Sequence, residues 1–209
     1  MGYDWAAAES LLTFSYPLTF SVLPYALHSS AIAEQAHGRG YHIMLHLPME
    51  SANGEAKREA VFLHAGMSPG EMAKAISGML ATVPYARGVN NHQGSLATTD
   101  PALMQELMAD LRGRKFYFID SRTTAASRAY SVARMSGVPA AYRRVFLDDT
   151  QTREATLRQL ALAVEDAQEN GWSIAIGHPY PSTLEALREF LPRAQSYGVR
   201  LVFVSDLVH

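Results

Sequence analysis

Cysteine is absent from the 209-residue chain, which excludes disulfide bonds, thiolate metal sites and a cysteine nucleophile. No apolar run reaches the roughly 18 residues that a membrane-spanning helix needs. The first residues, Met-Gly-Tyr-Asp-Trp, contain neither the basic nor the apolar segment of a secretory leader. A net charge of −2 gives no electrostatic footprint for nucleic acid. We therefore expect neither a membrane span nor a nucleic-acid partner.

Short apolar runs alternate along the chain with longer amphipathic segments. The composition, 48% hydrophobic and 18% charged, is that of a globular protein, and the length suits a single domain over residues 1–209. The expected strands are 18–23, 41–46, 86–90, 115–120, 144–148, 172–177 and 199–204. The expected helices are 4–14, 27–38, 69–83, 101–111, 124–135, 154–169 and 183–197. Ser68 and Asp100 are the expected N-caps of the third and fourth, and Gly113 is expected to end the fourth.

This alternation predicts right-handed βαβ units, and hence an α/β fold whose parallel sheet is either a barrel or an open sheet. The first expected element is a helix, whereas a chain of this type usually begins with a strand. The polar, irregular stretch 51–67 predicts a long loop over one face.

Polar residues gather where the expected strands end, which is where parallel α/β folds place their functional sites. The residues at these ends are His46 with Glu50, His92, Asp120 with Arg122, Asp148, and His178. Imidazoles together with a carboxylate suit a divalent metal ion such as zinc, and a further histidine could protonate a leaving group. Because P-loop and Gly-x-Ser-x-Gly motifs are missing, metal-assisted hydrolysis is the chemistry that these residues favour.

Each of these residues also has a purely structural reading. His46 could be a hydrogen-bonded core histidine and His92 could stabilise a turn. Asp120 and Arg122 could form a buried structural ion pair. Glu50 could be a solvated loop acid, and Asp148 could cap the following helix.

Five segments carry a resemblance to a known family. They are YHIMLHLPME at 41–50, GVNNHQGS at 88–95, FIDSRT at 118–123, RVFLDD at 144–149 and IAIGHP at 174–179. In this order they resemble the divergent polysaccharide deacetylase family, which is related to the NodB-type carbohydrate esterases. The resemblance implies a distorted (β/α) barrel of about seven parallel strands. It also implies metal-dependent removal of acetyl groups from a carbohydrate, a polysaccharide or peptidoglycan-like substrate, in a periplasmic or extracytoplasmic location.

The resemblance also implies roles for particular residues. His46 is similar to the first metal-binding histidine of ordinary polysaccharide deacetylases, and Glu50 stands where those proteins have a second histidine. His92 is then the expected replacement ligand, and His178 the general acid. Asp120 and Arg122 have no clear counterpart in ordinary members. Their expected roles come from their chemistry alone, with Asp120 as ligand or orienting group and Arg122 as a clamp on substrate or oxyanion. Asp148 is expected to face the site because it follows a predicted strand.

One departure from the family pattern leaves the activity open. Members begin with a strand that ends in two aspartates, and the sequence Met1-Gly2-Tyr3-Asp4 corresponds to the segment after that strand. Either the start is truncated, or the protein lacks the base that the family has. We therefore expect weakened metal binding and little hydrolysis. The alternatives are a non-catalytic carbohydrate-binding or envelope-interaction module, and a metal-dependent hydrolase acting on a non-sugar substrate. The sequence does not specify the oligomeric state.

Overall fold

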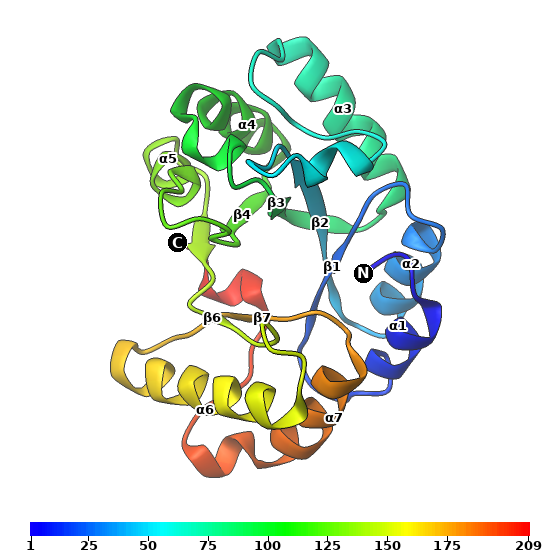
Figure 1. Ribbon diagram of the computed structural model, residues 1–209, viewed down its shortest axis with the longest axis vertical. Coiled ribbons are helices and arrows are strands. Elements are labelled where there is room, and N and C mark those ends of the chain that lie inside the picture. The colour runs from blue at the N-terminus through cyan, green and yellow to red at the C-terminus, as the bar shows by residue number, and fades with distance from the viewer.

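The computed structural model describes residues 1–209, apart from the side chain of Lys57. Parallel strands lie in the middle of the molecule and helices surround them (Figure 1). The strands are β1 (Thr19–Val22), β2 (His42–Met49), β3 (Ala86–Gln93), β4 (Tyr117–Asp120), β5 (Ala140–Tyr142), β6 (Val145–Phe146) and β7 (Ala175–Ile176). The helices are α1 (Trp5–Leu11), α2 (Ser29–Gly38), α3 (Pro69–Thr82), α4 (Pro101–Arg114), α5 (Ala129–Met135), α6 (Arg153–Asn170) and α7 (Pro181–Phe190).

The strands form two parallel sheets, one in the order β1-β2-β3-β4-β5 and the other made of β6 and β7. This arrangement confirms the predicted α/β fold with parallel strands. In the described part of the chain, no ladder joins β5 to β6 or β7 to β1, so the strands follow a barrel-like order without a continuous ring of hydrogen bonds. No described helix is both long and apolar enough to cross a membrane.

The strand expected at 199–204 is wrong. This segment has no strand pairing, and it leads into the 3₁₀ helix Val204–Leu207. The backbone N–H of Val204 donates to Thr19 Oγ1 at 3.2 Å, and His209 pairs with Ala140, at the start of β5. The C-terminal segment therefore crosses the end of the sheet where β1 and β5 begin, and leaves the carboxyl ends of the strands open.

The starts of α3 and α4 agree with the predicted ones, whereas the helix predicted at 124–135 begins only at Ala129. Ser68 and Glu71 form a reciprocal capping box at α3, and the Asp100 carboxylate accepts from two N–H groups at the start of α4. Gly113 does not end α4, which continues to Arg114 and stops at Lys115 in a left-handed conformation (φ +61°). The helix expected at 183–197 is α-helical only to Phe190 and continues as the 3₁₀ helix Leu191–Tyr197, because a proline at 192 lacks the N–H of an α-helical turn.

The two faces of the large sheet bury different clusters, because side chains alternate along each strand. The outer face packs against the helices through residues such as Leu45, Leu47 and Phe118. The inner face carries Met44, Tyr117, Ile119 and Ala141, which pack with Ile174 from the segment before β7. Gly88 makes room for the Tyr117 ring, whose carbons would lie 2.4 Å from a Cβ at that position. Farther along the same strands the inner face becomes polar.

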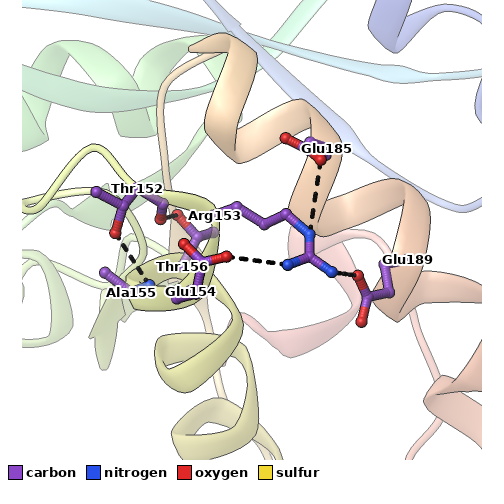
Figure 2. Close-up of polar contacts among 7 residues, drawn as sticks. All are labelled: Thr152, Arg153, Glu154, Ala155, Thr156, Glu185 and Glu189. Carbon is purple, nitrogen blue, oxygen red and sulfur yellow. Dashed lines mark hydrogen bonds and ion pairs between the residues drawn. The ribbon is translucent and has the colours of Figure 1, made fainter.

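Helices α6 and α7 are tied together beside the second sheet. Arg153 on α6 reaches across to Glu185 and Glu189 on α7, and also contacts its neighbour Glu154 (Figure 2). The Thr152 hydroxyl caps α6 by accepting from Ala155 N–H at 3.3 Å. Since α6 follows β6 and α7 follows β7, these contacts help hold the two loops that leave the second sheet side by side.

Candidate functional site

His46 and His92 face one another at the carboxyl ends of β2 and β3. The register pairs His46 with Asn90 and Pro48 with His92, so both imidazoles project from the inner face of the sheet. The ring centroids lie 4.7 Å apart, and His46 Nε2 is 3.1 Å from His92 Nδ1. The sequence predicted both histidines at this edge, and the structure brings them into contact.

Asn90 is the buried centre of this cluster, with 1% of its surface exposed. Its Oδ1 accepts from the Ser21 hydroxyl on β1 and lies 3.0 Å from His46 Nδ1, and its Nδ2 donates to Ser121 Oγ at 3.0 Å. Because Oδ1 can only accept, His46 Nδ1 carries the proton in this arrangement. The lone pair of neutral His46 is therefore on Nε2, the atom that faces His92.

Glu59 fixes the other imidazole in the same way. Its Oε1 lies 3.4 Å from His92 Nε2, and its Oε2 accepts from the Tyr3 hydroxyl at 3.4 Å. A carboxylate beside Nε2 favours the proton on that nitrogen, which leaves the lone pair of neutral His92 on Nδ1. Two lone pairs then point at each other across 3.1 Å, and a proton or a metal ion between them would satisfy both.

Both histidines are held towards their neutral form. Burial lowers the pKa of His46 well below its ordinary value of 6.5, and repulsion from His92 and His178 adds to the shift. Burial also lowers the pKa of His92, although Glu59 opposes this shift. Neutral imidazoles are the form that binds a metal ion.

Glu50 does not join this pair in the described structure. Its Oε2 accepts from Ala65 N–H at 3.4 Å, and its backbone oxygen accepts from Leu96 and Ala97. Glu59 instead lies beside His92. It comes from the irregular loop predicted at 51–67, which contains the 3₁₀ helix Glu55–Arg58 and returns to β2 through a bridge between Met49 and Leu63. The assignment of Glu50 as a metal ligand stays a prediction.

Asp148 orients His178 and does not cap α6, which Thr152 caps instead. The Asp148 side chain is fully buried, and its Oδ1 lies 3.0 Å from His178 Nδ1. Its Oδ2 accepts from the His178 backbone N–H and from the Thr183 hydroxyl at 3.0 Å. The His178 side chain itself is 45% exposed, so its ring is accessible from solvent while Asp148 fixes its direction.

Asp120 organises the loop after β4, and it does not form an ion pair with Arg122. Its Oδ1 accepts from the Arg122 backbone N–H at 2.8 Å, and its Oδ2 accepts from the Ser127 hydroxyl and the Tyr130 N–H. The Arg122 guanidinium lies 3.7 Å above the Tyr142 ring and is exposed. The alternative of a buried structural ion pair is therefore wrong, because Asp120 bonds the backbone of Arg122 while the guanidinium points outward.

A metal ion would find two nitrogen donors here. Two nitrogens at 2.0–2.1 Å from one tetrahedral zinc lie about 3.3 Å apart, close to the 3.1 Å between His46 Nε2 and His92 Nδ1. Among the described residues, no group of three or more histidine, aspartate or glutamate side chains is arranged to hold a metal ion. The pair thus fits two positions of a coordination sphere, and Glu59 fits the role of orienting His92.

The fold and this cluster define an α/β protein with histidines and carboxylates gathered at the carboxyl ends of its parallel strands. Residues 1–208 match the family described as divergent polysaccharide deacetylase, and the chain belongs to that family. It is 36% identical over 191 residues to the uncharacterized protein YibQ of Escherichia coli, covering 91% of this chain and 59% of YibQ. It is 34% identical over 207 residues to an uncharacterized protein of Haemophilus influenzae, covering 99% of this chain and 73% of that protein.

Two solved structures share the fold. An uncharacterized protein from Agrobacterium tumefaciens superimposes with a TM-score of 0.93 at 21% identity, over 100% of this chain and 85% of that one. The catalytic domain of a peptidoglycan N-acetylglucosamine deacetylase from Eubacterium rectale superimposes with a TM-score of 0.61 at 14% identity, over 98% and 83% of the two chains. At these identities the likeness concerns the fold alone.

Sequence reasoning missed several residues of the cluster. Glu59 and Tyr3 lie in segments without a strand-end signal, and Ser21 lies inside a strand rather than after it. Arg143 was also missed, although it follows directly after β5. That strand was not predicted because Ala140–Tyr142 is too short to form a recognisable apolar run.

Proposed function

We propose that this chain is a metal-dependent hydrolase that removes acetyl groups from a polysaccharide, and that His46 and His92 would hold a divalent ion such as zinc. The observation that carries the proposal is the facing pair of lone-pair nitrogens, each fixed by a partner on its other side. Such an ion polarises the acetyl carbonyl and lowers the pKa of a bound water. Membership of the divergent polysaccharide deacetylase family supports an acetylated glycan as the substrate.

The orienting groups support the proposal because they fix both imidazoles before any ion arrives. Asn90 holds His46 through Nδ1, and Glu59 holds His92 through Nε2. In metal sites, partners of this kind set the tautomer and direction of a ligating histidine. Burial lowers the pKa of both rings and so favours the neutral form that binds a metal ion.

His178 would hold and release the proton that the leaving sugar requires. Its Nδ1 is directed at Asp148, which leaves Nε2 as the atom that exchanges a proton in the neutral tautomer. Since the side chain is 45% exposed, this nitrogen can reach a bound glycan. Asp148 acts as a positioning residue in this scheme. An envelope glycan as substrate would place the protein in the periplasm or another extracytoplasmic location.

Metal binding can be measured separately from activity. The chelator-treated wild-type chain should bind Zn²⁺ by calorimetry, and the metal should raise its Tm. His46→Ala and His92→Ala should each weaken binding at least 10-fold. His64→Ala is the matched control, because His64 is exposed and its ring lies against Phe62 and the Ala65 carbonyl, without a contact to His46 or His92. Unchanged Zn²⁺ affinity in both site variants would refute the metal site.

Activity is tested by acetate release from N- and O-acetylated oligosaccharides. The wild-type chain with Zn²⁺ should release acetate, and His178→Ala should lower kcat with a smaller effect on KM. Glycan binding that survives His46→Ala and His178→Ala, with no acetate released from any substrate, would instead establish the non-catalytic carbohydrate-binding alternative. Release of acetate only from esters or amides that contain no sugar would show a hydrolase with a non-carbohydrate substrate.

A further inference from the structure

Two arginines that lack carboxylate partners lie beside the candidate site. Arg143 Nε donates to the Ser121 carbonyl at 2.6 Å, and its Nη2 donates to the Arg122 carbonyl at 2.8 Å. Within the described residues, the salt bridges include neither Arg122 nor Arg143. The next arginine differs, because Arg144 makes two bonds to the Asp166 carboxylate, each 2.5 Å long. Neither Arg122 nor Arg143 therefore has a carboxylate in direct contact with its guanidinium group.

The Arg122 side chain is held in place before any ligand is bound. Its backbone has a φ of +48°, which is unfavourable for a residue with a side chain. The buried Asp120 carboxylate fixes that conformation by accepting the Arg122 N–H at 2.8 Å. The guanidinium stacks 3.7 Å above the Tyr142 ring and remains exposed. Strain of this kind at an exposed cation is typical of a residue that is kept for a ligand.

These arginines lie between the two halves of the candidate site. On one side, Ser121 accepts from Asn90, which holds His46. On the other side, the Arg143 guanidinium lies 5.0 Å from the Phe146 ring centre, and the Phe146 and His178 rings form a T-shaped pair with centroids 5.7 Å apart. A glycan that reaches both the His46–His92 pair and His178 would therefore pass next to Arg122 and Arg143.

We propose that Arg122 and Arg143 form a subsite for an anionic group on the glycan, so that the substrate is an acidic polysaccharide carrying carboxylates or phosphates. This inference rests on the proposed function and specifies its substrate class. The planar guanidinium matches both carboxylate and phosphate oxygens. Among the described contacts, Arg143 Nη1 and the Arg122 guanidinium have no hydrogen-bond acceptor, so both are available to an anion.

The local charges agree with an anionic ligand. Burial lowers the pKa of Arg143, and repulsion from Arg122 lowers it further, while Asp120 opposes the shift. An anion placed between the two guanidinium groups would remove this repulsion. A neutral sugar could stack on Tyr142 and Phe146 but would leave the two charges uncompensated.

The test compares binding of three oligosaccharides of equal length by calorimetry. They are an N-acetylglucosamine oligomer, a hexuronic acid oligomer and a phosphorylated hexose oligomer. The wild-type chain should bind at least one acidic oligomer 10-fold or more tightly than the neutral one, with an affinity that falls as salt rises. Tighter binding of the hexuronic acid oligomer identifies the anionic group as a carboxylate, and tighter binding of the phosphorylated oligomer identifies it as a phosphate.

Arg122→Gln should remove most of that preference, since a hydrogen-bonded charge pair is worth about 10-fold or more in affinity. Its side chain is exposed, so folding is not at risk, and Arg193→Gln, on the far 3₁₀ helix, is the matched control. Equal binding of neutral and acidic oligomers, or an Arg122→Gln variant that keeps the preference, overturns the inference.

Failure of the inference can be distinguished from failure of the proposed function. If the inference fails, acetate release from the neutral oligomer would still support the proposed function. Binding of an acidic oligomer through Arg122, with no acetate released from any substrate, would instead refute the hydrolase while confirming the subsite.

Discussion

Asp148 offers a sharp test of how the second half of the site is held together. Its carboxylate is fully buried and accepts from the His178 backbone N–H, from His178 Nδ1 and from the Thr183 hydroxyl. Asp148→Ala leaves the backbone N–H and the buried hydroxyl without an acceptor, at a cost of about 1–3 kcal/mol each. The half-exposed His178 ring can hydrogen-bond to water instead, so the loss of its bond to Asp148 adds little to this cost.

The net effect is smaller than the sum of these two costs, because the variant no longer has to bury a carboxylate. We expect Asp148→Ala to lower the free energy of unfolding by about 3 kcal/mol, and the Tm by roughly 6–12 °C for a chain of this size. Urea and thermal unfolding followed by far-UV circular dichroism measure both quantities. Asp148→Asn, which keeps one acceptor oxygen, should lose about half as much.

Asp149→Ala is the matched control, since Asp149 is the exposed neighbour and should change stability by less than about 0.5 kcal/mol. If Asp148→Ala and Asp149→Ala unfold at the same urea concentration, the buried carboxylate does not hold the His178 loop as described. The positioning role given to Asp148 would then be withdrawn as well.

Further predictions concern pH and packing. The pKa of His46 is lowered below 6.5, so near and below that pH the unfolded chain binds more protons than the folded chain. The free energy of unfolding of the metal-free protein should therefore fall on acidification. In urea titrations between about pH 7.5 and about pH 5.5, His46→Gln should make this dependence on pH smaller. Gly88→Ala should destabilise by about 1–3 kcal/mol through its clash with Tyr117, whereas Gly113→Ala, in open space within α4, should stabilise by about 0.5–1 kcal/mol in the same unfolding assay. Lys115→Gly should raise stability by about 1 kcal/mol by relieving the left-handed backbone at the end of α4, and an unchanged Tm would contradict that reasoning.

The sequence predicted elements well where the signal was local. Ser68 and Asp100 marked the starts of α3 and α4, because a cap needs only the next few residues. The segment 199–204 is as apolar as a strand, yet it lies across the end of the sheet instead of pairing within it. The short strand Ala140–Tyr142 was missed because its pairing with β4 depends on neighbours far away in the sequence.

The histidines could be predicted for a topological reason. In a parallel sheet every strand ends at the same edge, so polar residues that follow successive apolar runs must gather there. His46 and His92 satisfied this rule, since they end neighbouring strands and contact one another. Glu59 could not be found in this way, because it lies in a loop whose path is set by the return of the chain to β2 at Leu63.

The sequence alone therefore determined the class of fold, the family and the edge of the sheet where the chemistry-bearing residues lie, since each follows from a periodic pattern or a contiguous motif. Only the tertiary structure decided which atoms meet. The β2–β3 register places Asn90 against His46, and the loop after β2 brings Glu59 to His92. Such contacts depend on strand register and loop path to within a few ångströms, and neither is encoded in the local spacing of residues.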